Sequence, residues 1–270
     1  MHLRGLGERP VQVEEARGDP FGQAEHAPIF SDVAAERLSD SAPMTVDVHV
    51  LDDPAAETAR RLVAAASTGG HLALTGSSTA QSAYEQAAAV PGDWGRAALW
   101  WGDERCVAPD DPRSNYRLAR EALIARLDPP PMVERIEGER GPQAGAELYE
   151  RTLRTTFADA APVFDLLLLG LGPDGHCASL FPGAPGLAVT DRWVVGVERA
   201  GLEPFVPRVS LTLPALTSAR ETLFLVSGAE KADAVRRAFG AGGDDVPARR
   251  VAEGAAGVTV LLDATAAQAL

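Results

Sequence analysis

The chain has 270 residues, of which 46% are hydrophobic and 23% charged, the composition of a globular protein large enough to bury a substantial core. Its formal net charge of −13 argues against a nucleic-acid partner, because proteins that bind nucleic acids neutralise phosphates with lysine and arginine. No apolar run reaches the roughly 18 residues of a membrane span, and the first residues lack the apolar core of a signal peptide, so we expect a cytoplasmic protein with no membrane contact.

Cysteine and lysine are both rare. The two cysteines, Cys106 and Cys177, supply neither a disulfide framework nor the ligand set of a zinc site. Of the 25 basic residues, only Lys231 is a lysine. Because arginine can replace a surface lysine but not a compact ammonium that is needed for function, Lys231 is either a remnant on a helix or a functional group.

The first part of the chain differs in composition from the rest. Residues 1–43 are rich in glycine, proline and glutamate without a sustained period, which predicts a weakly structured extension with a short helix around residues 31–38. From residue 44 to residue 270, apolar runs and helical stretches alternate. This alternation predicts a single α/β domain, Rossmann-like, with a mostly parallel sheet flanked by helices.

The periodicity of hydrophobic residues and the helix-capping residues predict the helices and strands of this domain in chain order. The predicted helices cover residues 54–67, 77–89 (capped by Ser77 or Ser78), 114–127, 143–157 and 229–240. The predicted strands cover residues 44–52, 71–76, 97–104, 164–170, 192–198, 207–213, 221–228 and 258–263. Ligands of such open sheets lie beyond the carboxyl ends of the strands, so we expect the loops after Leu74, Trp101, Leu169 and Val226 to converge.

The strand at 164–170 leads into the glycine-rich stretch LGLGPDGHCASLFPG. Gly170, Gly172 and Gly175 have the G-x-G-x-x-G spacing of a dinucleotide site, and a later strand closes with Glu198. That motif requires a helix after its third glycine. The prolines and glycines that follow Gly175 leave room for a helix of only about one or two turns. The stretch therefore favours acyl or sugar chemistry, in which glycines bring backbone amides near a developing oxyanion.

Within this stretch, His176 is the natural proton carrier near neutral pH, and Asp174 could fix its tautomer or attract its cationic form. The alternative for His176 is a core histidine bonded to a carbonyl. Ser179 lacks the surroundings of a G-x-S-x-G nucleophile, and the expected role for it is a helix cap.

Three other loops contain candidate residues. Small residues before a helix, Gly76 to Thr79, could present amides and hydroxyls to a phosphate or could only cap the helix. Asp103, Glu104 and Arg105 end a strand, either as part of a site or as a surface salt-bridge cluster. Lys231 lies in the first turn of a helix, where the dipole disfavours a cation unless an anionic ligand offsets it.

Taken together, the segments LALTGSSTA, WWGDERCVAPDDPRSNY, FDLLLLGLGPDGHCASLFPG, RVSLTLPAL, LFLVSGAEKADAV and VTVLLDATAAQAL resemble, in this order, the 6-phosphogluconolactonases. The resemblance covers nearly all of residues 46–270, and its third segment is highly specific. It implies a fold related to glucosamine-6-phosphate isomerases, no metal or other cofactor, and hydrolysis of 6-phospho-D-glucono-1,5-lactone to 6-phospho-D-gluconate in the oxidative pentose phosphate pathway. We expect a monomer with this small-molecule substrate as its partner.

The resemblance also implies roles for individual residues. His176 matches the general base of the family, with Asp174 beside it in the same motif. The remaining residues are implied to bind the phosphate and the sugar oxygens: Gly76, Ser77, Ser78, Thr79, Asp103, Arg105, Gly172, Gly175, Arg208 and Lys231.

The chain departs from the family pattern at three positions: Ser77 replaces a glycine, Ala80 a proline and Cys177 a common threonine. One alternative is a sugar-phosphate isomerase or deaminase of the same fold, but the deaminases have a glutamate soon after the histidine, and HCASLFPG has no carboxylate. The other alternative is a sugar-phosphate-binding regulator without catalysis, which would be expected to lack His176 or Asp174 or to have a DNA-binding domain.

Overall fold

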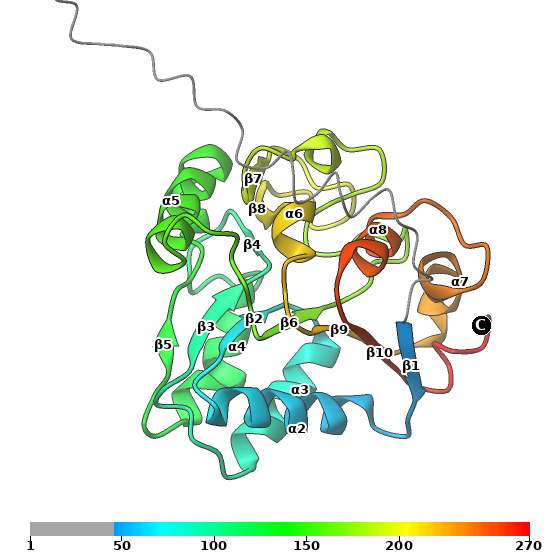
Figure 1. Cartoon of the computed structure of the whole chain (residues 1–270), viewed down its shortest axis with the longest axis horizontal. Coiled ribbons are helices and arrows are strands. Elements are labelled where there is room, and N and C mark those ends of the chain that lie inside the picture. The colour runs from blue at the N-terminus through cyan, green and yellow to red at the C-terminus, as the bar shows by residue number, and fades with distance from the viewer. Residues whose placement is uncertain (1–45) are drawn as a thin grey trace, which may run out of the picture.

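The computed structural model describes residues 46–270, so the predicted extension at 1–43 and its short helix lie outside the described residues. The centre of the fold is a sheet of seven strands in the order β1-β10-β9-β6-β2-β3-β5, and all of its neighbouring strands run parallel (Figure 1). The mostly parallel α/β fold predicted from the sequence is confirmed. The strands of this sheet are β1 (Val46–Val50), β2 (His71–Leu74), β3 (Ala98–Trp101), β5 (Met132–Val133), β6 (Leu166–Leu169), β9 (Thr222–Val226) and β10 (Val258–Leu262).

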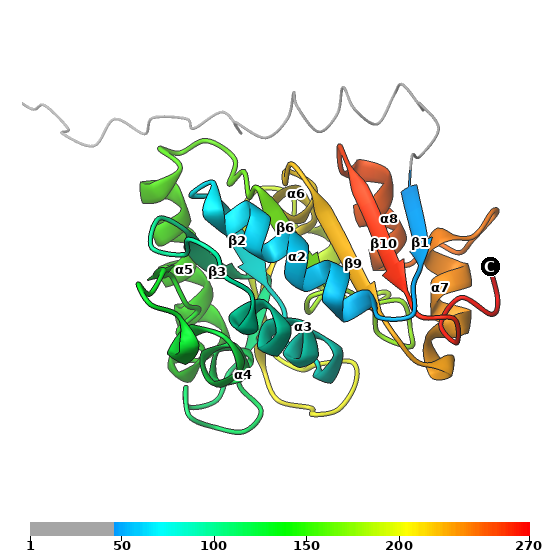
Figure 2. The ribbon, with the colours of Figure 1, turned by 90° about the horizontal axis from the view of Figure 1, so that it is seen from below.

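Helices lie on both faces of this sheet. Figures 1 and 2 show α2 and α3 on one face and α6 and α8 on the other. Every residue of the central strands β6 and β9 is buried, as expected for strands covered on both sides, which read as continuous apolar runs. The helices are α2 (Pro54–Ser67), α3 (Ser78–Ala89), α4 (Asn115–Ala122), α5 (Pro142–Thr156), α6 (Leu213–Leu216), α7 (Ala232–Phe239) and α8 (Pro247–Gly254). None of them is long and apolar enough to cross a membrane.

A second, antiparallel sheet was not predicted. It contains β4 (Asp103–Arg105), β8 (Arg208–Leu211) and β7 (Val194–Val197) in that order. The prediction of one continuous strand at 97–104 is wrong. The chain leaves the large sheet after Trp101 and joins the small sheet at Asp103. Gly102 makes this transition: its amide donates to Leu74 O at 2.9 Å, and its carbonyl accepts from Leu211 N at 2.8 Å.

Other differences from the predicted elements have local causes. The helix predicted at 114–127 ends at Ala122 and is followed by a 3-10 turn, and the helix predicted at 229–240 begins with a 3-10 turn, Ala229–Lys231. The strand predicted at 207–213 ends earlier because α6 begins at Leu213 with a proline in its first turn. Three elements were not predicted: this helix, the two-residue β5, and α8, which follows a glycine-rich segment.

Two buried tyrosines fix the carboxyl ends of neighbouring strands. The hydroxyl of Tyr84 donates to Thr75 O at 2.7 Å and accepts from Thr75 N at 3.0 Å, just after β2. The hydroxyl of Tyr149 likewise donates to Trp101 O at 3.1 Å and accepts from Trp101 N at 2.9 Å, at the end of β3. Each tyrosine thereby satisfies both backbone polar groups of one residue at the edge where the loops of the site begin.

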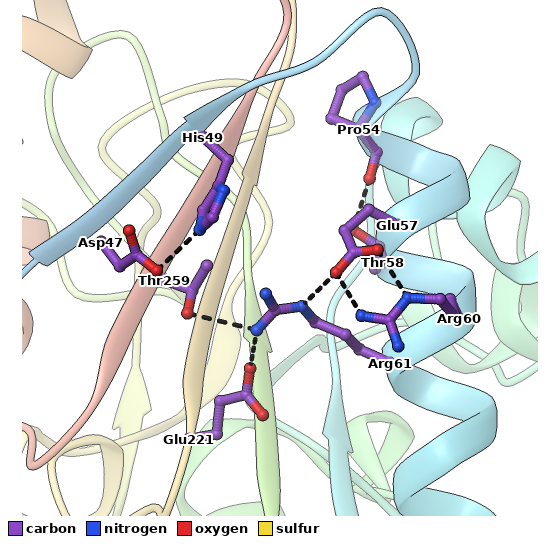
Figure 3. A network of polar contacts seen from close by, with 9 residues as sticks. All are labelled: Asp47, His49, Pro54, Glu57, Thr58, Arg60, Arg61, Glu221 and Thr259. Atoms are coloured by element: carbon purple, nitrogen blue, oxygen red, sulfur yellow. Dashed lines mark hydrogen bonds and ion pairs between the residues drawn. The ribbon is translucent and has the colours of Figure 1, made fainter.

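A network of charged side chains joins α2 to the sheet (Figure 3). Arg61 pairs with Glu57 at 2.8 Å, pairs with Glu221, and donates to the hydroxyl of Thr259 at 3.3 Å. Glu57 also pairs with Arg60 at 2.7 Å. The two hydrogen bonds from Arg60, together with the one from Arg61, lower the pKa of Glu57 to about 2 against the opposing effect of burial.

Candidate active site

The glycine-rich stretch forms a tight turn directly after β6. Gly175 N donates to Gly172 O at 2.9 Å, and Gly172 N donates to His176 O at 2.8 Å. Gly175 has a φ of +87°, in the left-handed region that favours glycine. The next helical segment is a four-residue 3-10 turn, Pro185–Ala188, which fits the predicted room for about one or two turns and lacks the helix that a dinucleotide site requires.

His176 and Asp174 form a pair within this turn. Nδ1 of His176 lies 2.5 Å from Oδ1 of Asp174, which also accepts the backbone amide of His176 at 3.1 Å. Partial burial alone would raise the pKa of Asp174, but its hydrogen bond and ion pair with His176 hold that pKa below its usual value. The imidazole is 20% exposed and bonded to a carboxylate, so His176 is not a core histidine held by a carbonyl.

The backbone on the other side of the ring leaves little space. A Cβ placed on Gly172 would lie 2.0 Å from His176 Nδ1, so only glycine fits there without displacing the ring. The ring also packs against Phe181, with centroids 4.6 Å apart. The imidazole is thus confined by a glycine backbone and an aromatic side chain, and Asp174 fixes one of its nitrogens.

Two arginines lie opposite each other in the small sheet. Arg105 of β4 is the cross-strand partner of Arg208 of β8, which is only 4% exposed. Arg208 lies 3.8 Å from Asp103 and donates to Pro204 O at 3.0 Å, and Arg105 donates to Arg113 O at 2.6 Å. Burial lowers the pKa of Arg208 and the charge of Arg105 adds to this, whereas Asp103 opposes it.

Both guanidinium groups still have donors to offer. Within residues 46–270, the buried Nε of Arg105 and that of Arg208 have no hydrogen-bond partner. Like charges directly opposite each other on a sheet repel, and buried donors without partners are costly. An anion between the two side chains would relieve both costs, so this pair is suited to bind a phosphate.

Asp103 connects the arginine pair to the histidine turn. Its Oδ2 accepts the hydroxyl of Ser179 at 2.6 Å, three residues after His176, and Oδ1 accepts Nδ2 of Asn115 at 3.1 Å. The expected helix-cap role of Ser179 is wrong, because no helix begins there and its hydroxyl is buried against Asp103. Asp103 and Glu104 are 4% and 3% exposed, so they are not a surface salt-bridge cluster either.

Asn115 was not predicted as a site residue, and for Glu104 the sequence left a site role and a surface role open. Asn115 also donates to Asp103 O at 2.8 Å. Its buried Oδ1 lies so close to Gly76 that a Cβ added to this glycine would be 1.8 Å from it. Glu104 accepts the amides of Asn115 and Tyr116 at 2.8 and 2.7 Å and the hydroxyl of Ser114 at 2.9 Å. The only feature of the sequence that could have drawn attention to Asn115 is its place next to Ser114, at the start of a predicted helix.

The remaining predicted residues lie at the same edge of the large sheet but make fewer contacts. Ser77 caps α3 by accepting Ala80 N at 3.0 Å, which resolves the choice between Ser77 and Ser78. In the described part of the chain, the side chains of Ser78, Thr79 and Lys231 make no hydrogen bond or ion pair, and Lys231 is half-buried at the start of α7.

The four predicted loops follow strands that are neighbours in the order β9-β6-β2-β3, so their convergence at one edge is confirmed. Within residues 46–270, no group of three or more histidine, cysteine or acidic side chains could hold a metal ion, and both cysteines are free.

Comparison with known proteins identifies the family. The family described as glucosamine-6-phosphate isomerases/6-phosphogluconolactonase matches residues 48–261. The chain belongs to this family.

Named relatives of this family are close in sequence. The chain is 42% identical to the 6-phosphogluconolactonase of Streptomyces coelicolor, over 66% of this chain and 72% of the relative. It is 40% identical to that of Synechocystis, over 63% and 71%. The solved 6-phosphogluconolactonase from Trypanosoma brucei superposes with a TM-score of 0.71 at 27% identity, over 84% of this chain and 98% of that one. The predicted resemblance is confirmed.

Proposed function

We propose that this chain is a hydrolase that converts 6-phospho-D-glucono-1,5-lactone to 6-phospho-D-gluconate in the oxidative pentose phosphate pathway. The observation that carries the proposal is the 2.5 Å contact between Asp174 and Nδ1 of a partly exposed His176. The names of the sequence relatives and the arginine pair nearby support it. The predicted cytoplasmic location and monomeric state are part of the same proposal.

His176 acts as the general base. Because Nδ1 faces Asp174, Nε2 is the nitrogen that takes a proton from water as the water oxygen attacks the lactone carbonyl. The new C–O bond gives a tetrahedral intermediate, whose collapse breaks the bond to the ring oxygen. That oxygen leaves as a hydroxyl with the proton from the imidazolium, which Asp174 stabilises in the meantime. The carboxylic acid product then releases one proton to solvent.

The developing oxyanion needs a donor, and the turn has few to give. The amides of Gly172, Gly175 and His176 already donate within the turn. A nearby cation is therefore favoured over the loop amides as the group that stabilises the oxyanion.

Arg105 and Arg208 bind the phosphate or the oxygens beside it through the donors that the protein leaves unpaired. Lys231 and the loop Gly76–Thr79, at the N-terminus of α3, supply further donors at the same edge of the sheet. Asp103 orients Arg208 and ties this side of the site to the histidine turn through Ser179.

The isomerase or deaminase alternative lacks support from the turn. Residues 177–183 contain no carboxylate that could help to open a sugar ring. A regulator without catalysis would have no use for the Asp174–His176 pair, because binding alone requires no proton carrier. Neither alternative is favoured by a specific observation.

Acid release tests the proposal directly. The purified chain is mixed with 6-phosphogluconolactone, and proton release is followed against the spontaneous background. We expect rapid opening of the lactone, strong loss of rate in His176→Gln, and no ammonia release from glucosamine 6-phosphate. A rate no higher than the background, or ammonia release, would exclude lactone hydrolysis as the function.

A further inference from the structure

The histidine turn depends on groups outside itself to hold its backbone. Among the carbonyl oxygens of residues 172–176, those of Gly172 and His176 accept amides of the turn. The carbonyl of Gly175 accepts Ala248 N, in the first turn of α8, at 3.1 Å. The two remaining carbonyls, of residues 173 and 174, belong to the segment that carries the carboxylate of the catalytic pair.

Both of these carbonyls accept hydrogen bonds from one side chain, Arg237 in the last turn of α7. Its NH2 donates to Pro173 O at 2.7 Å, and its NH1 lies 3.5 Å from Asp174 O, at the long end of the hydrogen-bond range. A planar guanidinium can reach two neighbouring carbonyls with its fork of donors, which a lysine cannot do. Arg237 is the side chain that links α7 to the backbone of Asp174.

The guanidinium is itself held in place. Its Nε forms an ion pair with Asp233, one turn earlier on α7, at 2.9 Å but without hydrogen-bond geometry, and the side chain is 21% exposed. The fork is therefore preorganised toward the turn before any substrate arrives. The same helix starts next to Lys231, so α7 carries a predicted substrate-binding cation at one end and the support of the histidine turn at the other.

We infer that Arg237 is a positioning residue for the hydrolysis: it holds the backbone of Pro173 and Asp174 so that the Asp174 carboxylate stays on Nδ1 of His176. The inference rests on the proposed function. Glycines on both sides of this segment, at 172 and 175, give the backbone other conformations to visit once the anchor is removed. A displacement of about 1 Å in a catalytic group can cost about 100-fold in rate.

The chain offers a matched control in the neighbouring residue. Arg236 also pairs with Asp233, at 2.8 Å, but it is 47% exposed and, within residues 46–270, its side chain makes no hydrogen bond or ion pair with the turn. Arg236→Met removes a charge of the same sign from the same helix and an ion pair with the same carboxylate. Arg237→Met keeps the apolar stem and removes the fork, and Arg237→Lys restores the charge with a single donor group.

The test measures kcat, KM, the affinity for 6-phosphogluconate and the ¹⁵N resonances of the His176 ring. For Arg237→Met we expect kcat about tenfold lower, product affinity within about twofold of wild type, and a changed Nδ1 resonance. We expect Arg237→Lys to recover part of kcat and Arg236→Met to match wild type. These results would separate positioning of the turn from a general loss of structure.

Two results would overturn the inference. One is a kcat of Arg237→Met within about twofold of Arg236→Met. The other is a parallel loss of kcat and product affinity, which would indicate a merely structural role. The ¹⁵N measurement needs no activity: if the wild-type chain failed to open the lactone, an Nδ1 resonance unchanged in Arg237→Met would still refute the positioning role by itself.

Discussion

The two halves of the proposed site are built in opposite ways. Arg208 belongs to a strand of a small antiparallel sheet, and its side chain is 5% exposed. His176 lies in a glycine turn, and its side chain is 20% exposed. A cation gains strength as an anion ligand when it is desolvated and fixed in advance, whereas a general base must remain accessible to water. In the proposed mechanism, recognition of the substrate is thus built into the sheet and proton transfer into the turn.

The sharpest way to separate the halves is to remove the base alone. His176→Gln keeps a side chain of similar length with no useful basicity. We expect kcat to fall by about 100- to 10,000-fold, the typical contribution of a positioned base, while affinity for 6-phosphogluconate survives. Stopped-flow proton release and calorimetric titration measure the two quantities. A variant that keeps most of its turnover would remove His176 from the mechanism.

The reverse experiment removes a cation and leaves the turn intact. We expect Arg208→Met to weaken product binding and raise KM by about 10- to 100-fold, since a charge-assisted hydrogen bond contributes about 1.5–3 kcal/mol. Arg192→Met is the control, because Arg192 is 57% exposed and, among residues 46–270, its side chain pairs only with its neighbour Asp191. Because removal of a buried charge can also destabilise the fold, circular dichroism must show that the variant is folded. Unchanged product affinity in folded Arg208→Met would contradict its role as an anion ligand.

The sequence predicts the turn better than the small sheet. Local signals suffice for α2 and narrow the cap of α3 to Ser77 or Ser78, and the Asp174–His176 pair lies within three residues of the chain. The arginine pair depends on strands more than 100 residues apart, and on the chain changing sheets at Gly102. No local pattern records such a change, because a strand looks alike whichever sheet it joins.

The same difference explains which site residues were missed. Asn115 and Arg237 act through a few contacts to backbone groups or side chains outside their own helices. Their own surroundings in sequence are those of ordinary helix residues. Only the three-dimensional structure shows that Asn115 Oδ1 fills the space beside Gly76, or that the fork of Arg237 faces two carbonyls.

The confinement of the imidazole can be tested with one methyl group. In Gly172→Ala the new Cβ would start 2.0 Å from His176 Nδ1, so the ring must move away from Asp174. We expect kcat about tenfold lower with little change in product affinity, the pattern of a misplaced base. Gly170→Ala is the control, because nothing lies within 4 Å of its Cβ position. Equal rates for the two variants would show that the ring tolerates displacement.

The smallest effect is expected outside both halves of the proposed site, in the ion-pair network of α2 (Figure 3). A substitution there should change the stability of the fold and leave catalysis unchanged. The pKa of Glu57 is lowered to about 2 in the folded protein, below its ordinary value of 4.5. A lowered folded pKa stabilises the fold fully above pH 4.5, and this contribution is lost as the pH falls through about 2. At pH 7 we expect Glu57→Gln to lower the free energy of unfolding by at most about 1 kcal/mol, with kcat unchanged.

Urea unfolding at pH 7, 4.5 and 3 measures this effect. The gap in free energy of unfolding between wild type and Glu57→Gln should narrow only below pH 4.5. A gap that stays constant down to pH 3 would mean that the charge of Glu57 contributes nothing to stability, and a change in kcat would mean that the face of the sheet covered by α2 is coupled to the site.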